Sequence, residues 1–307
     1  MASYFAGIDG GQSGTSAVIG DESGRILGRG DAGPADEVGE SAASTRLRDA
    51  LGGALFDAIR NAGLPEDTRF ERIVAGVSGY EGRVYGQPVH LPADSIELVH
   101  DTENAHAGAL GGTPGVIVIA GTGSVAFGLS ERGTRALVGG WGYLFGDEGG
   151  AFRLVRDLIA DAMRASDEGR SVGLAEQALA HFQQPTLRKL CRTFYYGSIT
   201  RAQFAAFAGS IVEQAARGDE AAARYVESAA TALVRLARLA TERCSMDSAR
   251  IAFIGGMTRS DYMQAQIGKR FRETIPQAQH VAAEYEPDVG ALLLAYKSSG
   301  VRITRVA

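Results

Sequence analysis

The sequence predicts an α/β fold in which one βββαβα pattern occurs twice. Short apolar and β-branched runs alternate with segments whose apolar residues recur every three or four positions. The segment order of the first half returns in the second, and no shorter repeat or low-complexity segment is visible. Because 307 residues suit two domains of about 150 residues, we expect the duplication to be one of domains.

The first half begins with three short strands, predicted at 4–8, 15–19 and 25–27. A helix follows over 40–61, because Leu47, Leu51, Leu55 and Ile59 recur every four residues. Gly63 and Pro65 then act as stop signals. Two further strands are predicted at 72–77 and 96–100, and a helix covers 105–110.

The second half restarts with strands predicted at 115–120, 125–129 and 135–138. A helix over 151–163 opens a helix-rich stretch that reaches residue 243, and a strand follows at 250–254. The remaining elements are a helix at 261–274, a short strand at 280–284 and a last helix at 287–299. We therefore expect a first domain over 1–112 and a second over 113–307, with a helical insertion at about 151–245; the C-terminal helix, 287–300, is a candidate to pack on the first domain.

Composition excludes several classes of protein. The chain is 45% hydrophobic, which is enough for a core, and its formal net charge of −5 gives no reason to expect a nucleic acid as partner. Two cysteines, Cys191 and Cys244, cannot form a disulfide framework or a cysteine-rich zinc site. The N-terminus lacks the features of a signal peptide, and the longest apolar run is too short to span a membrane. We expect a soluble, cytoplasmic protein without a membrane or nucleic-acid partner.

Two glycine-rich turns are candidate phosphate sites. DGGQSGT at 9–15 and AGTGS at 120–124 each join two predicted strands at the start of a half. Glycines let backbone N–H groups approach a phosphate closely, and an Asp at a strand end can organise Mg²⁺ through water. Two such turns in equivalent places can grip one polyphosphate across a cleft. The alternative for the turn at 9–15 is an ordinary glycine-rich hairpin. The alternative for the two turns together is that their equivalent places arose by chance.

The segment HDTENA at 100–105 places a carboxylate at a strand end, where α/β sheets bind ligands. A kinase that phosphorylates a hydroxyl needs an acceptor near the attacking oxygen, so Asp101 is the candidate base. On the local sequence alone, helix capping by Asp101 or Thr102 is the favoured interpretation of the segment. A metal site that uses His100, Asp101, Glu103 and His106 matches no recognised spacing.

A third kind of turn carries the one Trp of the chain. GGWGYLFGDEGG at 139–150 combines bare backbone, an aromatic ring and carboxylates, which suits a sugar with apolar faces and a rim of hydroxyls. The alternative is that Trp141 anchors the core and that Asp147 and Glu148 begin the next helix. Gly255 and Gly256 follow the strand at 250–254 and permit an adenine or ribose to lie against the backbone, although such a turn is very common in α/β proteins.

Taken in order, these segments resemble the N-acetylglucosamine kinase branch of the BadF/BadG/BcrA/BcrD ATPase family, within the sugar kinase, Hsp70 and actin superfamily. The resemblance covers nearly the whole chain, and GGWGYLFGDEGG and AGTGS are its most specific parts. It implies duplicated ribonuclease-H-like (actin-like ATPase) domains around an ATP cleft, with ATP and Mg²⁺ as cofactors. It also implies a homodimer and transfer of the γ-phosphoryl group to the 6-hydroxyl of an amino sugar, with N-acetylglucosamine foremost.

The resemblance also implies roles for single residues. Asp101 would be the catalytic base and touch the sugar, and Asp9 would organise Mg²⁺. The residues implied for ATP are Gly10, Gly11, Ser13, Thr15, Thr122, Gly123, Ala205, Gly255 and Gly256. The further residues implied for the sugar are Asp36, Ser78, Gly79, Gly140, Trp141, Gly142 and Asp147.

The sequence departs from the family pattern at two positions. Asp36 stands nearest to a usual Asn, and because an ionised Asp only accepts hydrogen bonds, glucosamine or a broad range of hexoses is the alternative substrate. Gly150 stands where a Ser is common.

An ATP-driven activator of an iron–sulfur reductase is the alternative of another class, but neither Cys191 nor Cys244 follows the second phosphate turn. A non-catalytic sugar sensor is disfavoured because Asp9 and Asp101 are both present.

Overall fold

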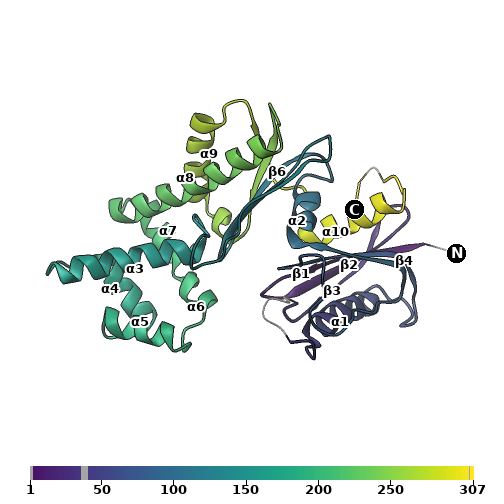
Figure 1. The fold of residues 1–307 in the computed structure, drawn as a ribbon, viewed down its shortest axis with the longest axis horizontal. Coiled ribbons are helices and arrows are strands. Elements are labelled where there is room, and N and C mark those ends of the chain that lie inside the picture. The colour runs from purple at the N-terminus through teal and green to yellow at the C-terminus, as the bar shows by residue number, and fades with distance from the viewer. Residues whose placement is uncertain (1–2, 36–40, 304) are drawn as a thin grey trace. The chain divides into compact units, whose positions relative to one another are not determined.

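A computed structural model describes residues 3–35, 41–303 and 305–307. The chain divides into two compact units, of which unit 1 comprises residues 1–113 and 282–307 and unit 2 comprises residues 114–281. Among the described residues, no helix is both long enough and apolar enough to cross a lipid bilayer. Each unit is an α/β structure around its own five-stranded sheet, as the repeated pattern predicts (Figure 1).

The sheet of unit 1 has the strand order β3-β2-β1-β4-β5. Its strands are β1 (Tyr4–Gly10), β2 (Thr15–Asp21), β3 (Ile26–Ala32), β4 (Phe70–Val77) and β5 (Ala93–His100). The first three form an antiparallel meander, whereas β1, β4 and β5 are parallel to one another. The carboxyl ends of β1, β4 and β5 therefore meet at one edge of the sheet.

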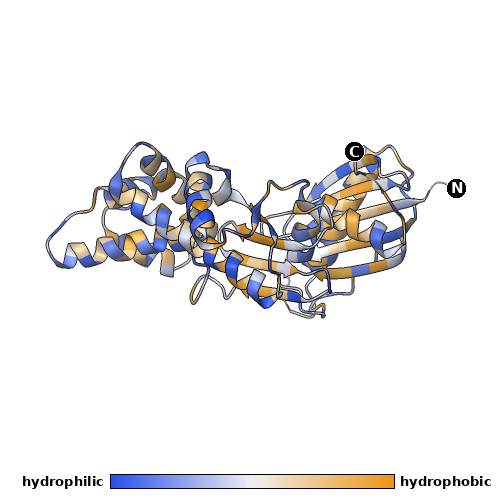
Figure 2. Cartoon of the chain, turned by 90° about the horizontal axis from the view of Figure 1, so that it is seen from above, coloured by the Kyte–Doolittle hydropathy of each residue, from blue (hydrophilic) through white to orange (hydrophobic). Residues whose placement is uncertain are grey.

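Helices cover both faces of this sheet. Helix α1 (Arg46–Asn61) lies on one face, whereas α2 (Asp101–Ala109) and α10 (Pro287–Ser298) lie on the other (Figure 1). Leu47, Leu51 and Leu55 are buried, so the fourfold spacing marks the core face of α1. In Figure 2, hydrophilic and hydrophobic segments alternate along the helices, as expected for helices with one buried face.

The predicted element bounds are wrong in several places. Helix α1 begins at Arg46 rather than at residue 40, because the Ser/Thr-rich stretch before it forms a turn in which Ser44 N–H donates to Ser41 O. The strand predicted at 25–27 runs to Ala32, where pairing with β2 continues past the apolar residues. The strand predicted at 280–284 is β10 (Gln279–His280), which pairs with Arg250 and Ile251 of β9.

Three glycines let α10 approach β1 and α2 with backbones in contact. A Cβ added to Gly290 would lie 2.0 Å from Asn104 O, and one added to Gly7 would lie 2.1 Å from Leu292 N. A Cβ added to Gly108 would lie 2.5 Å from Glu286 O. Because no side chain fits these gaps, the C-terminal helix fixes α2 on the sheet.

The sheet of unit 2 has the order β10-β9-β6-β7-β8 and repeats the design of unit 1. Its other strands are β6 (Gly115–Ala120), β7 (Ser124–Leu129), β8 (Arg135–Gly139) and β9 (Arg250–Ile254). The first three form an antiparallel meander, and β6 pairs in parallel with β9, as β1 does with β4. The matching topology confirms a duplicated α/β fold.

The helices of unit 2 form one large apolar core with its sheet. The predicted helical insertion contains α3 (Ala151–Asp167), α4 (Gly173–His181), α5 (Leu187–Tyr195), α6 (Arg201–Ala206), α7 (Ala208–Ala216) and α8 (Glu220–Arg243). After β9, a short 3₁₀ turn η1 (Gly256–Arg259) leads into α9 (Asp261–Thr274), whose bounds are the predicted ones. Buried residues of α8, among them Leu233 and Val234, pack in this core with Val116 and Val118 of β6.

We expect Gly290→Ala to lower the free energy of unfolding by about 1–3 kcal/mol, because the new methyl group overlaps the α2 backbone. Gly52→Ala is the matched control, since Gly52 lies within α1 with nothing within 4 Å of an added Cβ. Ala favours the helix over Gly by about 1 kcal/mol, so the control should be neutral or stabilising. Denaturant unfolding of both variants measures the difference, and equal midpoints would contradict the packing argument.

Candidate active site

A cluster of polar side chains lies at the carboxyl edge of the sheet in unit 1. Asp9 is the next-to-last residue of β1, His100 is the last residue of β5, and Asp101 is the first residue of α2. Register places Asp9 opposite Gly76 and His100 opposite Val77 on the intervening β4. The sheet therefore brings Asp101, the predicted base, and Asp9, the predicted Mg²⁺ residue, to one edge although they are distant in the sequence.

The start of α2 decides between two interpretations of Asp101. His100 is the N-cap, with extended backbone (φ −68°, ψ 141°), and Asp101 follows it as the first helical residue. Capping by Asp101 or Thr102 is therefore wrong, because the capping position is already taken. Asp101 keeps 27% of its side chain exposed, and its Oδ1 lies 2.9 Å from His100 Nδ1.

Asn104 is a member of this cluster that the sequence did not reveal. It is fully buried, its Nδ2 donates to Ile8 O at 2.9 Å, and its side chain also hydrogen-bonds Asp9. A Cβ on Gly76 would lie 2.0 Å from Asn104 Nδ2, so the glycine of β4 makes room for this amide. The sequence feature that could have identified Asn104 is its position three residues after Asp101, which places it on the inner side of the first turn of the helix. Asn104 thus ties α2 to the end of β1.

Burial and like charge determine the electrostatics of Asp9. The pKa of Asp9 is raised to about 7, chiefly by burial and next by the neighbouring charge of Asp101. The hydrogen bond from Asn104 opposes this shift, whereas Asp288 and Glu286 add smaller like-charge contributions. A cation beside Asp9 would relieve this crowding, and an oxygen donor at a strand end is what Mg²⁺ prefers.

The first glycine turn is held closed by its own backbone. Gly11 N–H donates to Gly14 O at 2.9 Å, and Gly10 O accepts from Ser78 N–H at 2.9 Å. Ser13 is exposed at the tip of the turn, whereas Thr15 is buried and its hydroxyl donates to Gly33 O at 2.7 Å. Gly79 follows Ser78 with a φ of 77°. The structure therefore brings the predicted residues 78 and 79 beside the first turn.

The second glycine turn is joined to the loop at 139–150 through Asp147. The carboxylate of Asp147 accepts hydrogen bonds from the backbone N–H groups of Ser124 and Gly142, and only 5% of the residue is exposed. A Cβ on Gly123 would lie 2.4 Å from Asp147 Oδ2. Burial raises the pKa of Asp147, while these N–H donors and the charge of Arg201 oppose the shift. Asp147 also has a φ of 61°, which places its backbone in the left-handed region that residues other than glycine rarely adopt.

The first turn of α3 completes this junction. Ala151 N–H donates to Gly121 O at 2.9 Å, and Phe152 N–H donates to Thr122 O at 3.0 Å. A Cβ on Gly150 would lie 2.7 Å from Gly123 C, which explains why this chain has glycine there. Because α3 begins at Ala151, the prediction that Asp147 and Glu148 open the helix is wrong. The second turn, the loop and α3 form one connected body.

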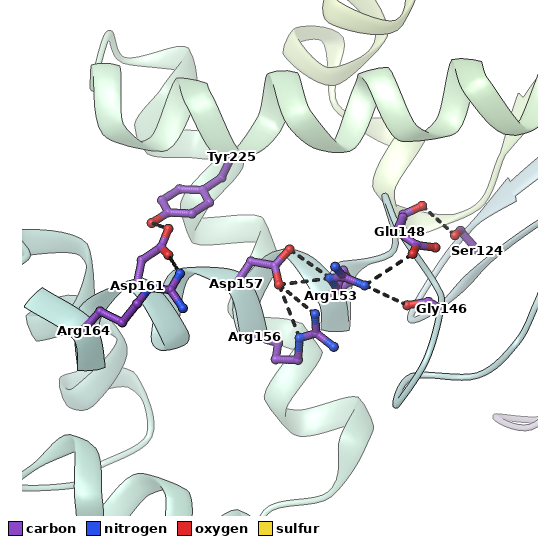
Figure 3. A network of polar contacts seen from close by, with 9 residues as sticks. All are labelled: Ser124, Gly146, Glu148, Arg153, Arg156, Asp157, Asp161, Arg164 and Tyr225. Atoms are coloured by element: carbon purple, nitrogen blue, oxygen red, sulfur yellow. Dashed lines mark hydrogen bonds and ion pairs between the residues drawn. The ribbon is translucent and has the colours of Figure 1, made fainter.

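Ion pairs along α3 hold the loop from the other side (Figure 3). Arg153 reaches Glu148 Oε1 at 3.5 Å and Gly146 O at 3.4 Å, and its Nε donates to both oxygens of Asp157 at 3.0 Å. Ser124 Oγ donates to Glu148 O at 2.7 Å. Further along α3, Asp161 accepts from Tyr225 of α8 at 2.8 Å.

Three large apolar side chains of the loop are exposed, whereas Tyr143 packs against the core. Trp141 is 78% exposed, and Leu144 and Phe145 are also exposed. Trp141 is therefore not a core anchor, and its ring is available to a ligand. Gly140 and Gly142 flank it with φ values of 70° and 81°, which only glycine adopts easily.

The remaining predicted residues fall into three places. Gly255 lies against the end of β6, where an added Cβ would be 2.6 Å from Ala120 O, so the end of β9 and the second glycine turn are neighbours. Gly256 opens η1. Ala205 lies on α6 in the apolar core, and Asp36 lies outside the described residues. Cys244 is buried and Cys191 is half-buried, and neither forms a disulfide.

Comparisons with known proteins identify relatives over almost the whole chain. The model of the BadF/BadG/BcrA/BcrD ATPase family matches residues 6–295. An N-acetyl-D-glucosamine kinase of Dictyostelium discoideum is 26% identical and covers 96% of this chain and 98% of its own length. An N-acetylmuramic acid/N-acetylglucosamine kinase of Clostridium acetobutylicum is 26% identical over 65% of this chain and 67% of its own. A solved structure described as an N-acetylglucosamine kinase of Chromobacterium violaceum is 26% identical, with a TM-score of 0.79 over 95% of this chain and 99% of that one.

Two glycines of the second turn should respond differently to the same substitution. Gly123→Ala places a methyl group on the Asp147 carboxylate and should lower the free energy of unfolding by about 1–3 kcal/mol. Gly121→Ala meets nothing within 4 Å and should change it by about 0.5 kcal/mol or less. Denaturant unfolding compares the two variants. If the Gly123→Ala protein is as stable as the Gly121→Ala protein, the close contact between Gly123 and the Asp147 carboxylate is contradicted.

Asp9→Asn should raise the stability of the metal-free protein at high pH. The pKa of Asp9 is about 7 in the folded protein and 3.8 in the reference state. Ionised Asp9 therefore lowers the free energy of unfolding, by an amount that grows from about pH 4 to pH 7 and is constant at higher pH. The gap in Tm between variant and wild type should therefore widen from pH 5 to pH 8 and then stay constant. Thermal unfolding in EDTA measures this gap. A gap that is independent of pH would show that Asp9 does not titrate in this range.

Proposed function

This chain belongs to the BadF/BadG/BcrA/BcrD ATPase family, and we propose that it is an ATP-dependent kinase that phosphorylates the 6-hydroxyl of an amino sugar, with N-acetylglucosamine as the preferred substrate. One observation carries the proposal: Asp101, at the start of α2, lies within electrostatic reach of the buried Asp9 at one sheet edge. The kinase names of relatives that match 96% and 95% of the chain support the same activity.

In this proposal Asp101 accepts the proton of the sugar hydroxyl. The residue is half-buried and keeps an accessible side chain at the end of a strand. A carboxylate at that place orients the hydroxyl for attack and takes up its proton as the new O–P bond forms and the bond from the γ-phosphorus to the leaving ADP breaks. Positioning of this kind supplies much of the rate in phosphoryl transfer, because the protein has little covalent chemistry to perform.

Asp9 is the residue that would hold Mg²⁺. Within the described ranges, no three His, Cys, Asp or Glu side chains gather to hold a metal ion. Mg²⁺ at Asp9 would therefore complete its shell with water and phosphate oxygens, as it commonly does in kinases. The bound ion would neutralise charge on the phosphates, and Asn104 would keep the Asp9 carboxylate in place.

The two glycine turns would serve the phosphates of ATP. The first turn, Gly10, Gly11, Ser13 and Thr15, belongs to unit 1, and the second, Thr122 and Gly123, belongs to unit 2. Thr15 would act by holding its turn, since its hydroxyl is already bound to Gly33 O. Gly255 and Gly256, which follow β9 beside the second turn, would receive the adenosine; Ala205 stays a predicted nucleotide contact.

The loop at 139–150 would bind the sugar. The exposed Trp141 offers its ring to an apolar sugar face, and Gly140 and Gly142 keep the adjacent backbone bare. Asp147, with its carboxylate on Ser124 N–H, would link the sugar loop to the phosphate turn. Ser78, Gly79 and Asp36 are the further proposed sugar contacts, and Asp36 is the one expected to sense the substituent at C2.

The test is ADP release with Mg·ATP and a panel of sugars: glucose, glucosamine, N-acetylglucosamine, N-acetylmannosamine and N-acetylmuramic acid. We expect N-acetylglucosamine to stimulate release most, and Asp101→Asn to lower kcat by about 10²–10⁴ because the base is lost. Sugar binding by the variant should persist and is measured by the fluorescence of Trp141, the one Trp of the chain.

Asp94→Asn is the matched control, since Asp94 lies on the same strand as His100 but is exposed and pairs with the exposed Arg69. It should keep full activity. Release of ADP that no sugar stimulates would refute the kinase, and strong stimulation by glucosamine alone would move the specificity to a free amine.

A further inference from the structure

The imidazole of His100 stands between the proposed base and its helix. His100 Nδ1 lies 2.9 Å from Asp101 Oδ1, 2.9 Å from Thr102 Oγ1 and 3.3 Å from Thr102 N. His100 is half-buried, whereas Thr102 is buried. One ring nitrogen therefore faces a carboxylate, a hydroxyl and an amide N–H at once.

Two of these neighbours, the carboxylate and the amide N–H, make opposing demands on the nitrogen, whereas the hydroxyl can donate or accept. Contact with the ionised Asp101 is a hydrogen bond only if Nδ1 carries a proton, because a carboxylate has no proton to donate. Acceptance from Thr102 N–H requires the opposite, a bare lone pair on Nδ1. The carboxylate contact is shorter than the amide contact, 2.9 Å against 3.3 Å, and charge-assisted hydrogen bonds are the stronger kind. The geometry favours Nδ1–H donating to Asp101.

The charges around His100 act in the same direction. The hydrogen bond to Asp101 raises the pKa of His100, and the charges of Asp101, Glu103 and Glu81 raise it further, while burial opposes them. Glu103 lies on α2 and Glu81 lies in the segment after β4, so acidic groups reach the ring from both neighbouring elements. These neighbours favour the protonated ring, and Nδ1 is the ring nitrogen that faces Asp101.

We propose that His100 is a positioning residue for the base: Nδ1–H holds Asp101 Oδ1, which fixes the carboxylate and leaves Oδ2 to accept the proton of the sugar hydroxyl. The inference rests on the proposed kinase activity. The hydrogen bond orients Asp101 in both the neutral Nδ1–H form and the cationic form of the ring. The cationic form also makes the carboxylate a weaker acceptor, because a neighbouring positive charge favours its ionised state. Activity should therefore rise as the ring loses its second proton.

A purely structural role gives different expectations. If His100 only caps α2, then any good cap restores the protein. Asn is among the best N-cap residues, and its side-chain oxygen can accept from the first helical N–H groups without any titration. His100→Asn therefore keeps the cap and removes the titrating ring, whereas His100→Ala removes both.

The activity test compares kcat against pH for the wild type, His100→Asn and His90→Asn. His90 is exposed in the same unit and serves as the control. We expect His100→Asn to unfold near the wild-type midpoint, to lose about tenfold in kcat with little change in the KM for ATP, and to lose a pH step that the wild type and His90→Asn share. Asp9 is retained in all three proteins, so a pH step that only His100→Asn loses belongs to His100. A His100→Asn profile that superimposes on the wild type overturns the proposal.

A second measurement needs no activity. The chain has five histidines, so the His100 ring can be followed by ¹H–¹⁵N NMR through a pH titration. Asp101→Asn removes the charge that holds the proton, and the pKa of His100 should fall; Asp94→Asn should leave it unchanged. An unaltered His100 titration in Asp101→Asn overturns the pairing. If the titration shifts but no sugar stimulates ADP release, the pairing stands and the kinase proposal fails, so the two failures are distinguishable.

Discussion

The contact of α10 with β1 and α2 is the constraint on which unit 1 depends. Backbones touch where Gly7, Gly108 and Gly290 carry no side chain, and the buried Asn104 lies at their meeting point. Asn104 bonds the end of β1 and belongs to α2, so the distance between Asp9 and Asp101 is set by close packing rather than by flexible loops. A segment from the end of the chain thereby fixes residues near its beginning.

Unit 2 uses the same device for another purpose. Gly123 and Gly150 bring two backbones together, and the Asp147 carboxylate fills the space beside Gly123 while it binds Ser124 N–H. The glycine turn, the exposed-Trp141 loop and α3 are consequently one body. A ligand that moves Trp141 would also move the N–H groups of the turn, because rigid, hydrogen-bonded segments shift together.

The sequence predicts features that local chemistry determines and misses those that distant segments determine. Strand ends carrying Asp9 and Asp101, and the glycine motifs, are legible because turn residues follow apolar runs. Asn104 was missed because its role comes from Gly76 and β1, which no local pattern connects to it. The N-cap role of His100 was missed because His is not a favoured cap. The outward direction of Trp141 could not be predicted either, since an aromatic residue between glycines suits a core equally well.

The burial of Asp9 beside the charge of Asp101 suits the binding of a cation, but it lowers the free energy of unfolding of unit 1. A buried Asp9 beside the charge of Asp101 has a pKa of about 7, so part of the population holds a proton there at neutral pH when no cation is bound. A cation that binds Asp9 must displace this proton, so metal binding depends on pH. The cation raises the free energy of unfolding most at a pH where the carboxyl is fully ionised. Asp101 lies beside the imidazole of His100, whereas Asp9 is buried and hydrogen-bonded by Asn104, so the two carboxyls have different surroundings. Two carboxyls with different surroundings can take different tasks, one holding a cation and the other accepting a proton.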